Sequence, residues 1–130
     1  MVSITANLLK QANPKQASEN TLRSILEYGK ETEFGRAHRF DYILAASNGE
    51  ELYSRYIEQI NPSDYEDYRP YIDRHKNGET DVLVPGKPVM YATTSGTTKE
   101  PKWIPITDVY LKTVYGKMTK VWLYNYIQNR

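Results

Sequence analysis

The spacing of apolar residues changes near residue 80, and this change limits the possible fold more than any other feature of the sequence. Before it, apolar side chains recur at helical intervals within residues 18–28 and 50–60. After it, short β-branched segments replace this spacing. The first pattern is typical of amphipathic helices and the second of strands. We therefore expect a mixed α/β (α+β) chain in which a helical layer precedes a few short strands.

Two amphipathic helices are predicted in the first part of the chain. The helix over residues 18–28 is expected to begin with Ser18 as its N-cap and to end at Gly29, because these residue types favour those two positions. The helix over residues 50–60 is stopped by Pro62, since a residue that precedes proline disfavours helical backbone.

A third helical segment is predicted before residue 80. Ser63 and Glu66 have the spacing of a capping box, which marks the start of a helix. Pro70 lies too far inside for one uninterrupted helix and is expected to open a new one. Gly78 is then expected to end the segment.

Three short strands are predicted next, over residues 81–84, 89–94 and 103–106. Thr107 or Asp108 can cap a last helix. The apolar stripe of that helix consists of Leu111, Val114, Met118, Val121 and Trp122. Because this stripe has no obvious partner, we expect the 130 residues to be a single partial N-terminal domain of a larger protein. Its expected parts are a helical segment (1–80), a strand–loop–strand segment (81–106) and a helix (108–130).

The charge balance and the absence of cysteine argue against several classes of partner and site. Lys and Arg number 17 against 16 Asp and Glu, so a net charge of +1 gives no strong field toward nucleic acid or an anionic membrane. Without cysteine there is neither a disulfide framework nor a thiolate metal site. No stretch approaches the roughly 18 apolar residues of a membrane-spanning helix. We expect a cytoplasmic protein without nucleic acid or membrane partners.

One segment carries recognisable chemistry. Thr93–Lys102 holds five hydroxyl side chains, one glycine and two lysines between two predicted strands. Gly96 can adopt a left-handed backbone, and consecutive backbone N–H groups in such a turn can surround an anion. Lys102 adds a positive charge, and Pro101 restrains the backbone before it. These features indicate a triphosphate-binding loop, and the alternative from the residues alone is a hydroxyl-rich hairpin turn with solvated lysines.

Other polar residues do not assemble into a site. His38 and His75 have no spacing typical of zinc ligands and are expected to be structural or solvated. Glu66 and Asp67 are adjacent, so on a helix their carboxylates do not face each other, and we expect turn or capping roles. Tyrosines at helical spacing suit a layer with a wet edge. They are Tyr53, Tyr56, Tyr65, Tyr68 and Tyr71.

The loop also resembles a known signature. Thr94–Thr98, followed by Pro101 and Lys102, is similar to the Thr-Ser-Gly-Thr-Thr-Gly-x-Pro-Lys signature of the acyl-adenylate-forming superfamily. Further segments, in order along the chain, resemble one branch of it, the auxin-responsive acyl-acid amido synthetase family. These segments are Thr32–Gly35, Tyr65–Ile72 and Lys102–Thr107. The chain is identified on these residues as a member of that family.

The resemblance implies an ATP-dependent ligase. The complete enzyme would convert ATP and a small carboxylic acid to an acyl-adenylate and pyrophosphate, and the amine of an amino acid would then attack to give an amide. The loop would hold the β- and γ-phosphates through Thr94, Ser95, Gly96, Thr97, Thr98 and Lys102. Magnesium is expected to accompany ATP with its ligands outside these 130 residues, and no catalytic residue is assigned.

The sequence departs from the signature at Lys99, which stands where the second glycine is expected. The adenine-binding and magnesium-binding motifs that follow the loop in this family, and its mobile C-terminal domain, have no counterpart in these 130 residues. We therefore expect the isolated chain to be inactive. We also expect it to self-associate through uncovered strand edges and the final helix. Two alternatives remain open: a non-catalytic helical interaction module, and another adenylate-forming ligase such as an acyl-CoA synthetase.

Overall fold

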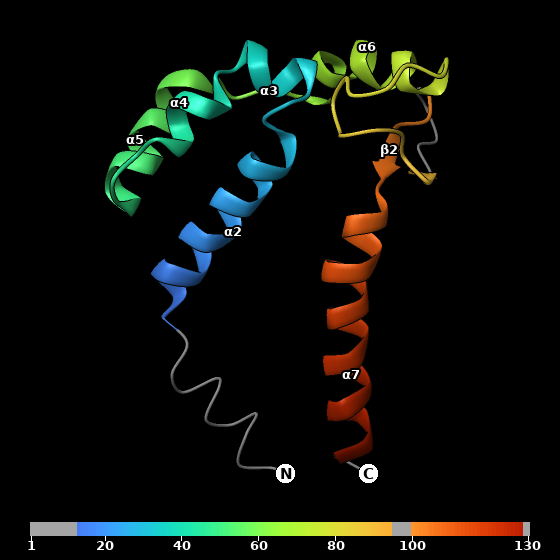
Figure 1. Ribbon diagram of the computed structural model, residues 1–130. Helices are drawn as coiled ribbons and strands as arrows, with labels where there is room; N and C mark the ends of the chain where they lie inside the picture. Colours follow the sequence, from blue (N-terminus) through green and yellow to red (C-terminus); the bar gives the residue numbers. More distant parts are fainter. Residues whose placement is uncertain (1–12, 95–99, 129–130) are drawn as a thin grey trace. The chain divides into compact units, whose positions relative to one another are not determined.

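The computed structural model describes the chain except for three segments, which are residues 1–12, 95–99 and 129–130 (Figure 1). The chain divides into two compact units, residues 1–62 and 63–130. The described part of the first unit is helical, whereas the second contains helices and a two-stranded antiparallel sheet. The protein is thus mixed in class and mostly helical. The single partial domain expected from the sequence stays a prediction.

The described part of the first unit consists of α2 (Pro14–Gly29), α3 (Glu33–Ala37), α4 (Phe40–Leu44) and α5 (Gly49–Gln59). Helix α4 contacts the other three and so occupies the centre of this unit. The core is a cluster of buried apolar side chains: Leu26, Phe40, Ile43, Ala46 and Leu52. Burial of each large side chain of this kind stabilises a fold by about 1.5–3 kcal/mol.

The two helices predicted in this unit are confirmed, but the first starts earlier than expected. Helix α2 begins at Pro14 rather than after Ser18, because the Asn13 side chain caps it by accepting a backbone N–H and proline suits the first helical position. Gly29 is the last residue of α2, as predicted. Asn48 caps α5 in the same way.

Helices α3 and α4 are absent from the sequence prediction. Each has five residues, which is too short for a helical period to be visible. Arg39 separates them with a left-handed backbone, at φ 51°. Phe40 and Ile43 of α4 are buried in the core. Packing in the folded unit, rather than local periodicity, therefore decides these two helices.

The second unit contains α6 (Tyr65–Lys76), β1 (Met90–Thr93), β2 (Trp103–Ile106), a π-helical segment η1 (Tyr110–Tyr115) and α7 (Gly116–Gln128). The strands pair antiparallel, with Met90 opposite Ile106 and Thr93 opposite Trp103. This pairing confirms the two strands predicted on either side of the hydroxyl-rich loop. Helix α6 contacts β2, which brings its side chains close to one end of that loop.

Helix α6 begins with a capping box one residue later than predicted. Asp64 and Asp67, rather than Ser63 and Glu66, form it: the Asp64 amide donates to the Asp67 carboxylate at 2.8 Å. Asp67 thus has the capping role that the sequence predicted for it.

The prediction that Pro70 opens a new helix is wrong. Helix α6 runs through this residue without a break, from Tyr65 to Lys76. Proline removes one helical hydrogen-bond donor. The loss is offset because Ile72 and His75, on the turns that follow, are buried in the folded chain.

The prediction of a strand over residues 81–84 is also wrong, because the His75 ring takes the N–H groups that a strand would offer to a neighbour. Its Nε2 accepts from Leu83 at 3.0 Å and from Val84 at 3.2 Å. Its Nδ1 can then donate to the Glu79 carbonyl at 3.0 Å. Burial lowers the pKa of His75 below its ordinary value of 6.5, which favours the neutral ring that this arrangement requires. His75 is therefore structural, as predicted.

Thr107 caps the final helical segment, as predicted, by accepting the Tyr110 amide at 3.1 Å. None of the described residues of α7 is buried, and Val121 and Trp122 are 56% and 65% exposed.

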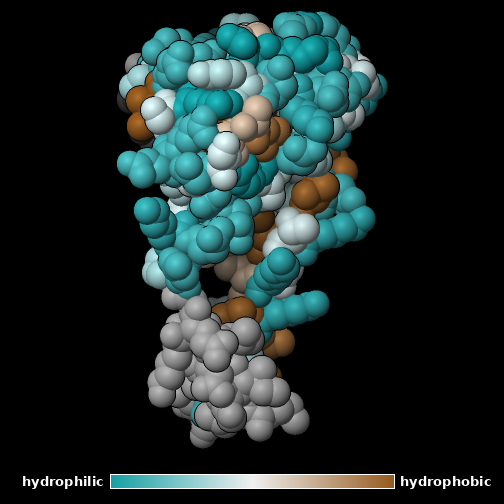
Figure 2. Space-filling model, turned by 60° about the vertical axis from the view of Figure 1, so that its left-hand side comes forward, coloured by the Kyte–Doolittle hydropathy of each residue, from teal (hydrophilic) through white to brown (hydrophobic). Residues whose placement is uncertain are grey.

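Figure 2 shows a face of the molecule on which hydrophilic side chains predominate and hydrophobic ones form separate patches. Over the described residues, no helix combines the length and apolar character needed to cross a membrane.

Candidate functional site

Strands β1 and β2 bring together the two ends of the predicted phosphate-binding loop. The Thr94 amide donates to the Lys102 carbonyl at 3.2 Å, which closes the hairpin at these two residues. Both residues are exposed. The other residues expected to bind phosphate lie outside the described residues: Ser95, Gly96, Thr97 and Thr98. The described part of the candidate site is thus the base of the loop.

The side chain of Tyr65 occupies the open edge of β2. Thr94 and Lys102 form a hydrogen-bonded pair, and hydrogen-bonded pairs alternate with non-hydrogen-bonded ones in an antiparallel sheet. The adjacent pair, Thr93 and Trp103, is therefore a non-hydrogen-bonded one. In such a pair the N–H and C=O of Trp103 point away from β1. Both meet the same hydroxyl: the Trp103 amide donates to the Tyr65 oxygen at 2.6 Å, and the Tyr65 hydroxyl donates to the Trp103 carbonyl at 3.2 Å. Helix α6 is thereby joined to the residue that follows Lys102.

Two cations lie against the Tyr65 ring. Lys102 Nζ is 5.3 Å from the ring centroid and the guanidinium carbon of Arg69 is 4.9 Å from it, within the range of cation–π attraction. Arg69 also bonds Glu66 at 2.7 and 3.0 Å and Glu100 at 3.4 Å. An arginine side chain stays charged in proteins, and the hydrogen bond to Glu66 raises the pKa of Arg69 further. The base of the loop therefore carries two positive charges, Lys102 and Arg69, and two carboxylates, Glu66 of α6 and Glu100 of the loop, both of which bond to Arg69.

The Trp103 ring lies between further side chains of the second unit. Lys76 Nζ, from the end of α6, is 4.5 Å from its centroid. Tyr91 of β1 meets it edge-on at 6.3 Å, and burial raises the pKa of Tyr91. Both neighbours of β2 thus contact Trp103, which makes this residue the point where helix and hairpin meet.

The donor set at the loop base suits an oxyanion. Lys102 supplies positive charge, whereas the charge of Arg69 is offset by Glu66 and Glu100. The loop sequence adds hydroxyl and backbone donors. Over the described residues, no three His, Cys, Asp or Glu side chains gather in a way that could hold a metal ion. Phosphate fits this chemistry, whereas no ligand set for a magnesium ion is assigned in the described part of the chain.

Sequence reasoning assigned Tyr65 to the wet edge of a helical layer and missed its contact with the loop. The half-buried state predicted for it and the other helical tyrosines is confirmed. Tyr65 and Arg69 are four residues apart, which puts them on one face of α6. This spacing could have indicated that Tyr65 and Arg69 contact the same partner. Nothing in the sequence indicates which backbone groups the Tyr65 hydroxyl meets.

The Thr32–Gly35 segment, which carries part of the family resemblance, is structural. Thr32 is buried, accepts the Gly35 amide at 2.9 Å and donates to the Gly29 carbonyl at 2.7 Å. A Cβ atom at Gly35 would collide with the backbone of Gly29. His38 Nδ1 bonds a backbone carbonyl at 2.9 Å, so this histidine is structural, as predicted. The corner between α2 and α3 is a packing feature rather than a ligand site.

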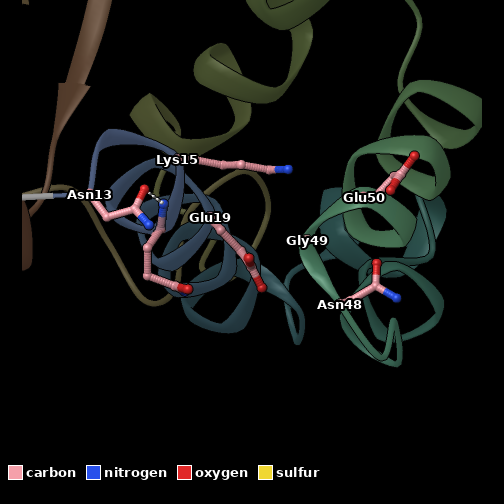
Figure 3. Close-up of a pocket in the computed structure, with 7 residues that line it drawn as sticks. Asn13, Lys15, Glu19, Asn48, Gly49 and Glu50 are labelled. Carbon is pink, nitrogen blue, oxygen red and sulfur yellow. Dashed lines mark hydrogen bonds between the residues drawn. The ribbon is translucent and has the colours of Figure 1, made fainter.

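A hollow of about 290 Å³ lies between the first turns of α2 and α5 (Figure 3). Asn13 and Asn48 face it but serve as N-caps of the two helices. Glu19 is paired with Arg23 at 3.0 Å. These polar groups hold the helices, and the hollow offers no set of donors that matches one class of ligand.

Comparison with known proteins identifies the family. The model of the GH3 family N-terminal domain matches residues 7–130. The probable indole-3-acetic acid-amido synthetase GH3.13 of Oryza sativa subsp. japonica is 34% identical over 107 residues, which cover 80% of this chain and 22% of that protein. The indole-3-acetic acid-amido synthetase GH3.15 of Arabidopsis thaliana is 31% identical over 119 residues, which cover 88% of this chain and 19% of that protein. No solved structure matches.

The chain spans about a fifth of the length of these curated relatives. The family match covers the loop, the Thr32–Gly35 corner and the Tyr65–Ile72 segment, so it confirms the resemblance inferred from those residues. This chain therefore belongs to the GH3 family, and residues 7–130 correspond to its N-terminal domain.

Proposed function

We propose that this chain is the phosphate-binding part of an ATP-dependent acyl-acid amido synthetase. The observation that supports the proposal is the β1–β2 pairing, which joins the two ends of a hydroxyl-rich segment at Thr94 and Lys102, so that Lys102 lies at its base. The names of the two relatives supply the reaction class, since both are called indole-3-acetic acid-amido synthetases. In this proposal the second unit is part of an adenylate-forming N-terminal domain.

The reaction proposed for the complete protein has two steps. A carboxylate oxygen of a small acid attacks the α-phosphorus of ATP, and pyrophosphate leaves. The amine of an amino acid then attacks the acyl carbon, so that an amide forms and AMP leaves. Negative charge grows on the departing pyrophosphate, and fixed donors around it stabilise that charge.

The loop residues proposed for this role are Thr94, Ser95, Gly96, Thr97, Thr98 and Lys102. Lys102 contributes a full positive charge at the loop's end, and the hydroxyl and amide groups contribute hydrogen bonds. The magnesium that accompanies ATP would take its ligands from the remainder of a complete enzyme. Under this proposal the 130-residue chain binds phosphate groups but does not make amides.

Thermal unfolding with and without magnesium and ATP tests the proposal. A ligand at about 100 times its Kd adds about 2.7 kcal/mol to the free energy of unfolding. We expect this gain in the parent chain and in Lys87→Ala, and a smaller gain in Lys102→Ala; both lysines are exposed. Lack of stabilisation in all three proteins would favour the alternative of a non-catalytic helical interaction module.

Variants of the loop in a complete enzyme test the binding residues. Ser95→Ala and Thr97→Ala each remove one hydroxyl donor and should lower the rate of ATP–pyrophosphate exchange. Lys99→Gly restores the glycine of the superfamily signature and should strengthen nucleotide binding, because it frees the backbone of a tight turn. Exchange rates equal to the parent's in both alanine variants would remove the phosphate role.

The acceptor of the acyl group separates this proposal from the related ligase class. A complete amido synthetase should release AMP in the presence of its acid and an amino acid, with an amide as the product. An acyl-CoA synthetase would require coenzyme A instead. Amide formation by the isolated 130-residue chain would contradict the proposal that this chain is inactive alone.

A further inference from the structure

We propose that Tyr65 is a positioning residue for the phosphate site: its hydroxyl fixes the backbone of Trp103 and thereby the direction in which Lys102 leaves the hairpin. This inference rests on the function proposed above, since it assigns Lys102 to phosphate.

The contact between the Tyr65 hydroxyl and the Trp103 backbone lies where the loop joins β2. Trp103 is the first residue of β2, and its outward N–H and C=O would otherwise form an open strand edge. Tyr65 satisfies both groups with one hydroxyl, at 2.6 Å and 3.2 Å. The connection joins positions 38 residues apart, and it is made by α6 rather than by the strand partner β1.

The first turn of α6, which carries Tyr65, is held by a capping box. Tyr65 is the first residue of α6 and follows the N-cap residue Asp64, which a capping box with Asp67 holds in place. One turn later, Arg69 lies over the same ring and also reaches Glu100, two residues before Lys102. Helix α6 therefore contacts the loop on both sides of Lys102.

The consequence concerns the lysine. Its backbone lies between the Thr94 pair and the Trp103 contact, and its ammonium group lies 5.3 Å from the centre of the Tyr65 ring. Tyr65 thus contacts the ammonium group of Lys102 with its ring and fixes the backbone next to Lys102 with its hydroxyl. A lysine held in this way loses less conformational freedom when it binds an anion, which increases affinity without any added contact.

Calorimetric titration of the 130-residue chain with inorganic tripolyphosphate at low ionic strength tests the inference. Tyr65→Phe keeps the ring and removes the hydroxyl, and we expect it to weaken tripolyphosphate binding about fivefold to tenfold. Tyr68→Phe is the matched control, because it also removes a hydroxyl of α6, one that bonds Ser63 at 2.6 Å. This control should bind within about twofold of the parent.

A double-mutant cycle separates positioning from general stability. If Tyr65 acts through Lys102, then Tyr65→Phe should change affinity by less than about twofold in a Lys102→Ala background. Amide hydrogen exchange at Trp103 without ligand should be faster in Tyr65→Phe than in Tyr68→Phe.

Each outcome of these measurements decides one claim. Faster exchange at Trp103 with unchanged tripolyphosphate affinity in Tyr65→Phe would overturn the positioning role and leave the proposed function in place. An equal loss of affinity in both the parent and the Lys102→Ala background would overturn it as well. If the parent chain binds no tripolyphosphate, the proposed function fails, and the positioning role falls with it.

Discussion

The two units of this chain are held by different proportions of apolar and polar contacts. The first encloses a cluster of buried apolar side chains that pack on one another around α4. In the second, side chains bond to distant backbone: His75 to the loop that follows α6, and Tyr65 to Trp103. Apolar burial has no preferred direction, whereas a hydrogen bond weakens steeply when its geometry changes. The first unit also has side-chain bonds to distant backbone, from Arg23 to the Leu44 and Ala46 carbonyls and from Arg55 to the Tyr42 carbonyl. It buries more large apolar side chains than the described part of the second unit, where Ile72 and Val82 are buried, so the second unit depends more on a few polar contacts.

The largest expected effect compares one buried and one exposed apolar residue. Leu52, in the first unit, is fully buried, and Leu52→Ala should lower the free energy of unfolding by about 2–5 kcal/mol. Val121, in α7, is 56% exposed, and Val121→Ala should change it by less than about 0.5 kcal/mol. Urea unfolding followed by circular dichroism measures both. Equal losses would show that α7 is covered in solution and would remove the contrast between the units.

The second prediction concerns close backbone packing in the first unit. A Cβ at Gly35 meets the backbone of Gly29, which cannot move aside as a side chain could. We expect Gly35→Ala to cost about 3 kcal/mol. Gly86, in the second unit, has φ 62° with no atom within 4 Å of an added Cβ, so Gly86→Ala should cost only the strain of a left-handed backbone, about 1–2 kcal/mol. Thermal unfolding of the two variants ranks them, and the reverse order would contradict the packing argument.

Acid should weaken the second unit through His75. Its folded pKa is lowered by burial, and to a lesser extent by Arg74, while Glu79 and Asp81 oppose the change. The unfolded chain therefore binds the proton more readily. The contribution of the neutral ring is complete above the ordinary pKa of 6.5 and is lost as the pH falls below it toward the folded value.

Unfolding midpoints at about pH 5 and about pH 7.5 measure this effect. In His75→Gln the difference between the two midpoints should be smaller, because the titrating ring is gone. In the folded protein the ring stays neutral until the pH reaches its lowered pKa, so the NMR signals of the Leu83 and Val84 amides, which donate to the ring, should stay in place while the midpoint first falls. If the midpoint of His75→Gln falls as much between the two pH values as that of the parent chain, the acid effect arises elsewhere.

The smallest expected effect on unfolding comes from α7, whose apolar face should instead govern self-association. Trp122 is 65% exposed and stacks on Tyr126 at 5.7 Å, and Met118 is 62% exposed. We expect the chain to associate at concentrations on the order of tens of micromolar, because burial of each large side chain contributes about 1.5–3 kcal/mol. Trp122→Glu should favour the monomer and leave the free energy of unfolding of the monomer nearly unchanged. If light scattering finds the parent chain monomeric at these concentrations, the predicted self-association through the apolar face of α7 is wrong.

Much of the first unit and of the hairpin could be predicted from the sequence. The apolar spacing within residues 18–28 and 50–60 predicted α2 and α5, since a helical period needs only local residues to be visible. The two strands around the hydroxyl-rich loop followed from their composition. The family also followed from residues in order along the chain, and the family match confirms it.

The tertiary structure alone decided three features of this chain. In each, a contact formed in the folded chain overrides the local preference of the sequence or joins residues that are distant in sequence. Pro70 should end a helix by local chemistry, yet burial of Ile72 and His75 carries α6 through it. Residues 81–84 have the composition of a strand, but the His75 ring takes the amides that a strand would need. The Tyr65 hydroxyl meets Trp103 only because α6 lies against β2. Residue spacing determines which face of a segment is apolar, whereas the partner of a buried polar group depends on where the folded chain places it.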